Sequence, residues 1–209
     1  LHTAYRRQRQ MCIRDRLYDT PSGDLILSGI GLETAASGFQ EGVNVGSAVA
    51  SYSMDQKFSD YYAIYQGLDQ FSDVGGAPNQ IAHLVDASVP RYRPRVVLSE
   101  NLLGGSMVAE DRAKWEMSRR QGRSFYVRLN TDSWRDSAGA LYTPNTMAPL
   151  VLPSLKLGSA AAPASWLIAE TTYNRGRAGT TCDVVLMPPQ AFYQQPFIWA
   201  QFAPDQVVG

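Results

Sequence analysis

Hydrophobic and polar positions alternate along much of the chain from residue 17 onward, and this period of two predicts β-strands. In residues 46–55, GSAVASYSMD, and 59–67, SDYYAIYQG, alternate side chains share one face. Only the linker DQKF, residues 55–58, separates the two patterns. We therefore expect two long neighbouring antiparallel strands, stabilised by aromatic cross-strand pairs.

Shorter β patterns occupy most of the remaining chain. The turn residues at 21–24 precede the apolar run 25–27 and predict a hairpin. Residues 67–90 lose the periodicity and are predicted to be a loop or insertion, and the final 20 residues an extended tail. Further strands are expected at 95–98, 125–129, 140–142, 147–154, 165–174 and 182–189, with the last two joined as a hairpin.

A single helix is predicted between the strands at 95–98 and 125–129. Ser106 is placed to cap its N-terminus and Gly122 to end it. Ala109, Ala113 and Met117 form one apolar stripe at a spacing of four. The pairs Glu110–Lys114 and Glu116–Arg120 have the favourable i, i+4 order, so the charges are expected to support the helix and contact a neighbouring element or chain.

The charge balance changes once the first 16 residues are considered separately. The chain has 209 residues, 44% of them hydrophobic, and a formal net charge of zero. Residues 1–16 hold five arginines and one aspartate, 5 − 1 = +4, which leaves 0 − 4 = −4 for the rest. An acidic body offers no electrostatic surface for a phosphate backbone, so we expect no nucleic-acid contact.

The basic segment itself has three readings: a nucleic-acid arm, a transit peptide or a non-native sequence. Its residues 8–16, QRQMCIRDR, resemble the translation of a sequencing adapter. We interpret residues 1–16 as a junction artefact and expect the natural chain to extend further upstream. Cys182 is then the one thiol of residues 17–209. No apolar run in the sequence reaches the roughly 20 residues that span a bilayer.

Candidate chemistry is sparse. GIGLET, residues 29–34, has two of the three glycines of a dinucleotide fingerprint, and no G-x-S-x-G motif occurs. His83 near Asp86, and the acid pairs Asp132–Asp136 and Glu33–Glu41, are more often surface or structural groups than catalytic ones. We predict no catalytic residue, metal site or cofactor.

Four motifs in a fixed order resemble the baseplate hub proteins of Mu-like contractile-tailed phages, the tail protein P family. They are an R-x-R-P strand, an A-x-x-R-A-x-W-E helix ending in R-x-G-R-S, a G-x-L-[WY]-x-P-N turn and a closing P-x-A-F. The resemblance covers about residues 20–195. The matching positions are Arg91–Pro94, Ala109–Glu116 with Arg120–Ser124, Gly139–Asn145 and Pro189–Phe192.

The resemblance implies an α+β, mostly β fold, in which tail-tube-like antiparallel β-barrel domains carry a small α/β module. The expected domains follow in chain order after the artefact at 1–16. They are an incomplete β domain at 17–90, an α/β module with one helix at 91–145, a β-hairpin region completing a tube-like domain at 146–193 and an extended tail at 194–209.

By the same resemblance the protein is a non-enzymatic virion component, assembled in the host cytoplasm. The resemblance further implies a homotrimeric hub that contacts the tail tube and spike and adapts the six-fold tube to the three-fold spike. Alternatives are the hub part of a type VI secretion-like spike and a tail-associated cell-wall hydrolase using Asp132, Asp136 or His83. We expect the chain alone to aggregate through unpaired strand edges. The interaction candidates are Arg91, Arg93, Arg112, Trp115, Glu116, Arg120, Arg123, Tyr142, Pro144 and Asn145.

Overall fold

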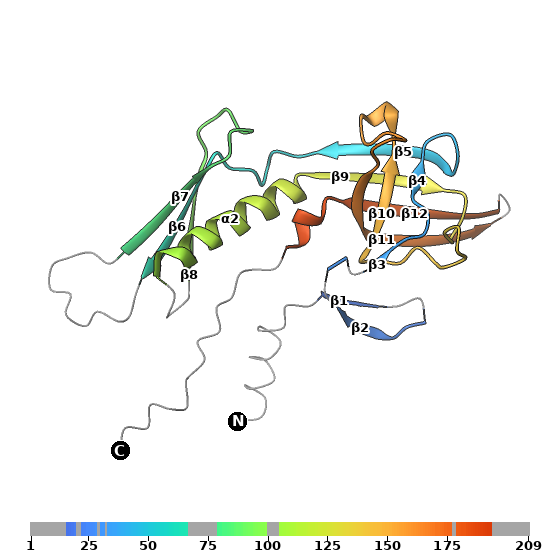
Figure 1. Cartoon of the computed structure of the whole chain (residues 1–209), viewed down its shortest axis with the longest axis horizontal. Helices are drawn as coiled ribbons and strands as arrows, with labels where there is room; N and C mark the ends of the chain where they lie inside the picture. The colour runs from blue at the N-terminus through green and yellow to red at the C-terminus, as the bar shows by residue number, and fades with distance from the viewer. Residues whose placement is uncertain are drawn as a thin grey trace, which may run out of the picture. The chain divides into compact units, whose positions relative to one another are not determined.

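The structure, a computed structural model, divides into two compact units (Figure 1). Unit 1 contains the described residues up to 56 and from 119 to 193, and unit 2 contains those from 57 to 118. These limits differ from the domain boundaries expected at 90/91 and 145/146. The predicted artefact, except Arg16, and the tail domain expected at 194–209 lie outside the described residues. Of the 20 residues expected to be extended, 190–193 are described, and 190–192 belong to a 3-10 helix. The structure describes residues 16–19, 22–28, 30–31, 33–66, 79–99, 105–176 and 179–193.

Unit 1 begins with the predicted hairpin. Strands β1 (Arg16–Asp19) and β2 (Leu25–Ser28) pair antiparallel, with Leu17 opposite Leu27. Gly23 in the connecting turn has a φ of 89°, a left-handed conformation that glycine adopts without steric cost. The turn residues at 21–24 therefore identified the hairpin correctly.

The main sheet of unit 1 has seven strands in the order β3-β10-β11-β12-β9-β5, with β4 also pairing with β10. The central pairs are antiparallel, whereas β3 and β4 run parallel to β10. The predicted hairpin of β11 and β12 is confirmed. The strands are β3 (Glu33–Thr34), β4 (Phe39–Gln40), β5 (Val45–Tyr52), β9 (Phe125–Thr131), β10 (Thr146–Val151), β11 (Ala164–Gly176) and β12 (Gly179–Met187).

One face of this sheet forms the core of unit 1. Alternate residues along β9, β10 and β12 are almost fully buried, which is the arrangement that a period-two pattern produces. Phe39 from β4 packs against Tyr142 with tilted rings at a centroid distance of 4.7 Å and extends the core across the shortest strands. The buried strand residues include Val127, Leu129, Ala148, Leu150, Cys182, Val184 and Leu186.

The described sheet stays open, whereas the resemblance predicts a barrel. Strands β4 and β5 approach each other at one bridge, Glu41 with Val45. Closure requires a continuous strand ladder, which one bridge does not supply. The α+β, mostly β class is confirmed, and a closed barrel is wrong for the described residues. Residues 140–142 likewise make a single bridge, Arg135 with Leu141, in place of the predicted strand.

Unit 2 is a three-stranded sheet with a helix on one face. Strand β6 (Asp60–Gln66) is central, with β7 (Asn79–Val85) antiparallel and β8 (Pro94–Ser99) parallel to it. Helix α2 (Gly105–Arg123) begins in unit 2 and ends in unit 1. It is the one α-helix of the described ranges, and no helix among those ranges is long and apolar enough to cross a membrane.

The helix packs on the sheet through small side chains. Ala109 and Ala113 are fully buried against Tyr61 and Ala63 of β6, and Met117 adds to this cluster. The predicted stripe at 109, 113 and 117 is therefore the buried face of α2. Alanine at two successive turns lets the helix lie close to the strand backbone.

Two predictions about this region are wrong. The segments expected to pair with each other belong to different sheets, since β5 pairs with β9 and β6 pairs with β7 and β8. Alternation identifies the face of a side chain and leaves the neighbouring strand undetermined. Residues 79–85, expected to be irregular, form strand β7.

The end of α2 is fixed by close packing rather than by a glycine cap. Gly122 lies inside the helix, and a β-carbon there would come within 2.1 Å of the Ala191 backbone nitrogen. Ala191 belongs to the short 3-10 helix η2 (Pro189–Phe192) of unit 1. Gly122 therefore permits a close approach of two backbones. The other 3-10 helix described, η1 (Pro153–Leu155), follows β10.

Candidate interaction surfaces

The candidate residues on the first part of α2 stabilise the helix itself. The Arg112 guanidinium lies 4.6 Å from the centroid of the Trp115 ring, a cation–π geometry, and Glu116 is only 5% exposed. The predicted Glu110–Lys114 pair is present at 2.6 Å, and its hydrogen bond raises the pKa of Lys114. The charged side chains of this part of α2 therefore interact mainly with one another and stabilise the helix.

The candidates at the end of α2 hold segments of unit 1. Nη1 of Arg120 donates to Oε1 of Gln56 at 2.8 Å, and Nε of Arg123 donates to the Ala191 carbonyl at 3.2 Å. Arg123 thus reinforces the contact that Gly122 allows. Neither contact could be read from local sequence, because both partners are far away along the chain.

The R-x-R-P segment borders β8 in unit 2. Arg93 exchanges two hydrogen bonds with Ser59: its N–H donates to the serine hydroxyl at 2.7 Å, and its carbonyl accepts from the Ser59 N–H at 3.0 Å. Its guanidinium lies over the Phe58 ring at 4.9 Å. Arg91, in contrast, is exposed. Arg93 is therefore a structural residue, and Arg91 remains a surface candidate.

The candidate turn at 142–145 is part of the core of unit 1. Tyr142 is 2% exposed, burial raises its pKa, and its carbonyl accepts a hydrogen bond from the Tyr173 hydroxyl. Asn145 has a φ of 70°, and its side-chain oxygen accepts the Gly31 N–H at 3.1 Å. Asparagine tolerates this left-handed conformation better than most residues, which accounts for the P-N turn. Pro144, between them, is half-buried.

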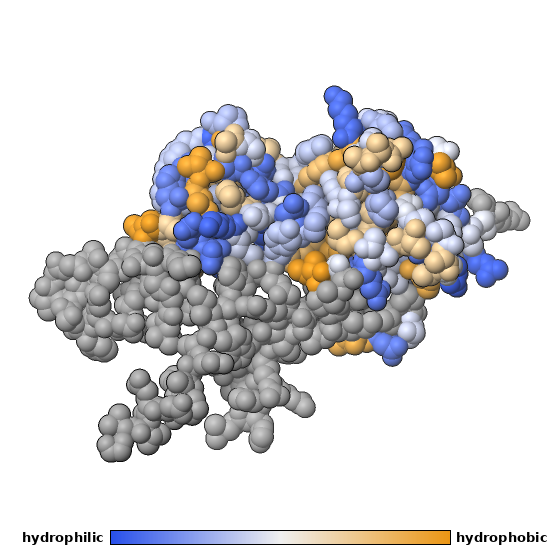
Figure 2. All heavy atoms as spheres, in the orientation of Figure 1, coloured by the Kyte–Doolittle hydropathy of each residue, from blue (hydrophilic) through white to orange (hydrophobic). Residues whose placement is uncertain are grey.

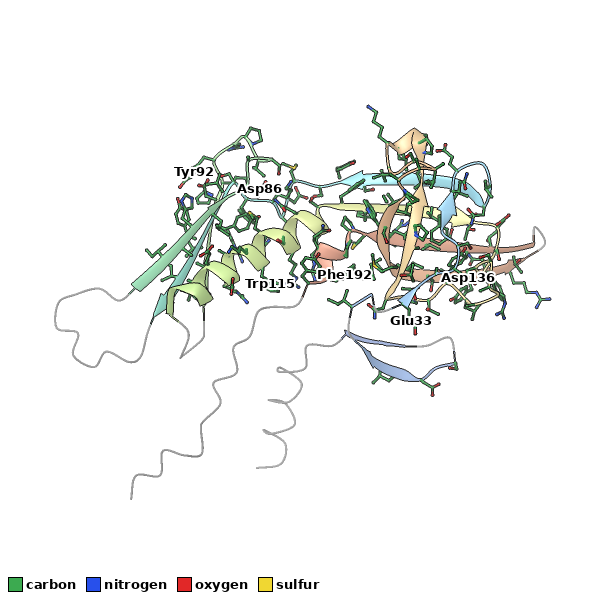
Figure 3. The ribbon with its side chains drawn as sticks, viewed as in Figure 1. Glu33, Asp86, Tyr92, Trp115, Asp136 and Phe192 are labelled. Carbon is green, nitrogen blue, oxygen red and sulfur yellow. The ribbon has the colours of Figure 1, made fainter. Side chains whose placement is uncertain are left out.

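The acids considered for a hydrolase have structural contacts. Asp136 and Glu33 line a groove of about 670 Å³ in unit 1 (Figure 3). The Asp136 carboxylate accepts backbone N–H groups from Ala36, Ala138 and Ala140, and these bonds lower its pKa. A carboxylate held in this way organises a turn. Within the described ranges no three His, Cys, Asp or Glu side chains form a metal-binding group.

His83 has structural partners in unit 2. Its Nε2 lies 2.7 Å from Oδ1 of Asp60, and its ring stacks on Tyr62 at 4.3 Å. Hydrogen bonds from Ser59 first, and from His83 second, hold the pKa of Asp60 below its usual value. Asp86, which the sequence places near His83, instead accepts hydrogen bonds from Ser88 and lies 3.9 Å from Lys57.

Sequence reasoning missed the face of the unit 2 sheet that points away from α2. Strand register places three rows of side chains across β7, β6 and β8 on this face: Ile81–Ile64–Leu98, His83–Tyr62–Val96 and Val85–Asp60–Pro94. Its outer aliphatic side chains are 57% to 68% exposed. The alternation of residues 79–85 and 94–98 was the available signal. Figure 2 shows hydrophobic residues among hydrophilic ones at the surface of both units.

Comparisons with known proteins agree with this architecture. A tail protein of prophage MuSo2 from Shewanella oneidensis matches with a TM-score of 0.69 and 22% identity over 92% of this chain. A tail protein from Neisseria meningitidis MC58 matches with a TM-score of 0.63 and 13% identity over 87% of this chain. These likenesses establish the fold, and the chain spans 54% of the length of each protein. No curated protein matches the sequence.

Residues 105–195 match the family model of the fourth domain of the Mu phage baseplate assembly protein GpP. Residues 105–195 of this chain therefore resemble the fourth domain of a Mu phage baseplate protein. The matched range contains α2, the turn at 142–145 and η2, and so three of the four motif groups. Arg91–Pro94 lies outside it.

Proposed function

We propose that this chain is a structural component of a phage tail baseplate in the virion, and that it forms a homotrimeric hub of a contractile tail, which contacts the tail tube and the spike and adapts six-fold to three-fold symmetry. The match of residues 105–195 to a Mu phage baseplate domain supports the place in the tail. The trimeric hub is what the family resemblance implies. The open sheet of unit 1 gives a physical reason for the chain to associate with further copies.

Strand β5 is the observation that carries the proposal. It is the last strand of the seven-stranded sheet, eight residues long, and its described neighbour on one side is β9. A long edge strand presents backbone N–H and C=O groups for pairing with another chain. A ring of subunits removes such edges by continuing the sheet from one copy to the next.

The charged face of α2 supplies a second element for assembly. Glu110, Asp111 and Lys114 are exposed, and the Glu110–Lys114 pair leaves this turn of the helix with little net charge. Arg91 is the exposed candidate on unit 2. Surface charges of this kind set the orientation and rate of association more than its strength.

Native mass spectrometry of the full chain tests the proposal directly. We expect complexes of three copies at micromolar concentration, and we expect these complexes to bind the tail-tube and spike proteins of the same phage. A stable monomer, or a trimer that binds neither protein, overturns the proposed hub. Peptidoglycan digestion by the same sample would instead support the hydrolase.

A further inference from the structure

The short 3-10 helix η2 (Pro189–Phe192) has little to stabilise it by itself. Its backbone hydrogen bonds run from the Ala191 N–H to the Pro188 carbonyl at 3.0 Å, and from the Tyr193 N–H to the Gln190 carbonyl at 3.4 Å. Such bonds have poorer geometry than those of an α-helix, and a single turn does not repay the cost of fixing its backbone. η2 therefore depends on packing against its surroundings.

The end of α2 provides that packing. Ala191 is fully buried, and a β-carbon at Gly122 would come within 2.7 Å of three backbone atoms of residues 190 and 191. Nε of Arg123 donates to the Ala191 carbonyl at 3.2 Å. Figure 3 labels Phe192, the last residue of η2. The backbones of η2 and α2 are therefore in direct contact, and a charged donor forms a hydrogen bond beside that contact.

The end of α2 depends on η2 in turn. Glycine is among the least favourable residues inside a helix, because it loses the most backbone freedom on folding. Gly122 is buried one residue before the end of α2. If η2 moved away, the backbone at Gly122 would face water, and the weakest turn of the helix would lose its packing. Each element therefore stabilises the other.

We propose that η2 and residues 120–124, together called the latch, open and close as one unit while the seven-stranded sheet stays folded. Elements that are weak alone and stabilise each other unfold together, at a lower free energy than the core around them. The inference does not depend on the proposed trimer, because every residue of the latch belongs to unit 1 of a single chain.

The latch also contacts both places where the described chain passes between the two units. The chain leaves unit 1 after Gln56 and returns to it after Ser118. Nη1 of Arg120 donates to Oε1 of Gln56 at 2.8 Å and to its carbonyl at 3.3 Å. The Ser53 N–H donates to the Ser124 carbonyl at 2.8 Å. Opening of the latch therefore loosens the linker that precedes unit 2 and the end of the helix that follows it.

Amide hydrogen exchange of the full chain, followed by NMR, tests the latch. Four hydrogen-bonded amides report on it, namely those of Ser53, Ser124, Ala191 and Tyr193. In the wild-type protein they should exchange through one shared opening and have similar protection factors. The amides of the buried β9 residues Val127 and Leu129 should be protected more strongly, because exchange there requires opening of the sheet.

Two variants perturb the latch from opposite sides. Arg123→Gln removes the guanidinium that binds η2, and Ala191→Gly removes a buried methyl group from η2 alone. Either change should accelerate exchange at all four amides by the same factor, about tenfold, because each removes one interaction of moderate strength. Arg128→Gln, at an exposed position of β9, is the matched control and should leave all four amides unchanged.

Other behaviour gives different exchange patterns. If Ala191→Gly accelerates exchange at residues 191 and 193 and leaves Ser53 and Ser124 unchanged, η2 opens alone and the proposal is wrong. Equal acceleration at Val127 and Leu129 would mean that the variants lower the stability of the whole unit, which also overturns the latch. Neither result bears on the trimer, which native mass spectrometry tests separately.

Discussion

Oδ2 of Asp136 accepts a hydrogen bond from the Ala36 N–H at 2.9 Å, joining two residues that lie 100 positions apart. Oδ1 of the same carboxylate accepts from Ala138 and Ala140 within its own turn. One side chain therefore both forms a local turn and attaches it to the segment between β3 and β4.

Replacing Asp136 with Asn should lower the stability of unit 1 at pH 7. The amide oxygen can still accept within the turn, but the amide NH₂ would face the donor Ala36 N–H. We expect a loss of about 1 kcal/mol. Because the folded carboxyl has a lowered pKa, its contribution is present above the unfolded pKa of about 3.9 and is lost as pH falls through the folded pKa.

Urea unfolding at pH 7 and near pH 3 measures this effect. The difference between wild type and the Asp136→Asn variant should be largest at pH 7 and should shrink in acid. Asp132→Asn, at an exposed position, is the control and should change little. An equal difference at both pH values would contradict the role given to the charged carboxylate.

Gly122→Ala should destabilise the protein although alanine favours helices. The gain in helix propensity is about 1 kcal/mol, whereas the added β-carbon would meet the Ala191 backbone at 2.1 Å. Backbone atoms at that distance cannot move aside locally, so we expect a net loss of about 1–3 kcal/mol. Gly46→Ala, whose β-carbon meets no atom closer than 3.7 Å, is the control in thermal unfolding. A stabilised Gly122→Ala protein would show that η2 does not hold this position.

Thr131→Val should increase stability. The Thr131 side chain is fully buried in unit 1, and its hydroxyl has no hydrogen-bond partner. Valine has nearly the same shape and removes the unpaired hydroxyl, which should add about 1 kcal/mol to the free energy of unfolding. The exposed position Thr172→Val should stay within about 0.5 kcal/mol of wild type. A destabilised Thr131→Val protein would mean that this hydroxyl is satisfied in solution.

Cys182 should be unreactive in the folded protein. Burial raises the pKa of its thiol to about 11, which lowers the thiolate fraction at pH 8 by roughly a hundredfold compared with an ordinary cysteine. In a Cys12→Ser background, we expect slow alkylation by iodoacetamide in buffer and rapid alkylation in concentrated urea, measured by mass spectrometry. Rapid labelling under native conditions would indicate local opening of β12.

Local sequence patterns predicted the strands and the helix better than they predicted which strands pair with each other. The hairpin at Gly23, the α2 stripe at Ala109 and the pairing of β11 with β12 each depend on neighbouring residues, and all three are confirmed. The Glu110–Lys114 pair is local for the same reason. Such features follow from propensity and spacing within one or two turns.

The candidate residues required the fold before their roles could be assigned. Gly122 has the position of a helix cap in sequence, and only the return of the chain at Ala191 reveals the close contact. The partner of β5 is β9, which follows a complete intervening unit. The exposed face of the unit 2 sheet was missed for a related reason. Alternating side chains predict a half-buried strand, and only the structure shows which of its two faces the helix covers.

The insertion of unit 2 between β5 and β9 has a consequence for synthesis on the ribosome. Ala50 pairs with Val127, so β5 leaves the ribosome long before its partner strand exists. The described residues of unit 2 all lie between β5 and β9 and can fold in that interval, whereas β5 stays an unpaired nascent strand until translation passes residue 131. Chaperone binding during translation should therefore concentrate on β5, and slowing translation before β9 should lower the yield of soluble protein.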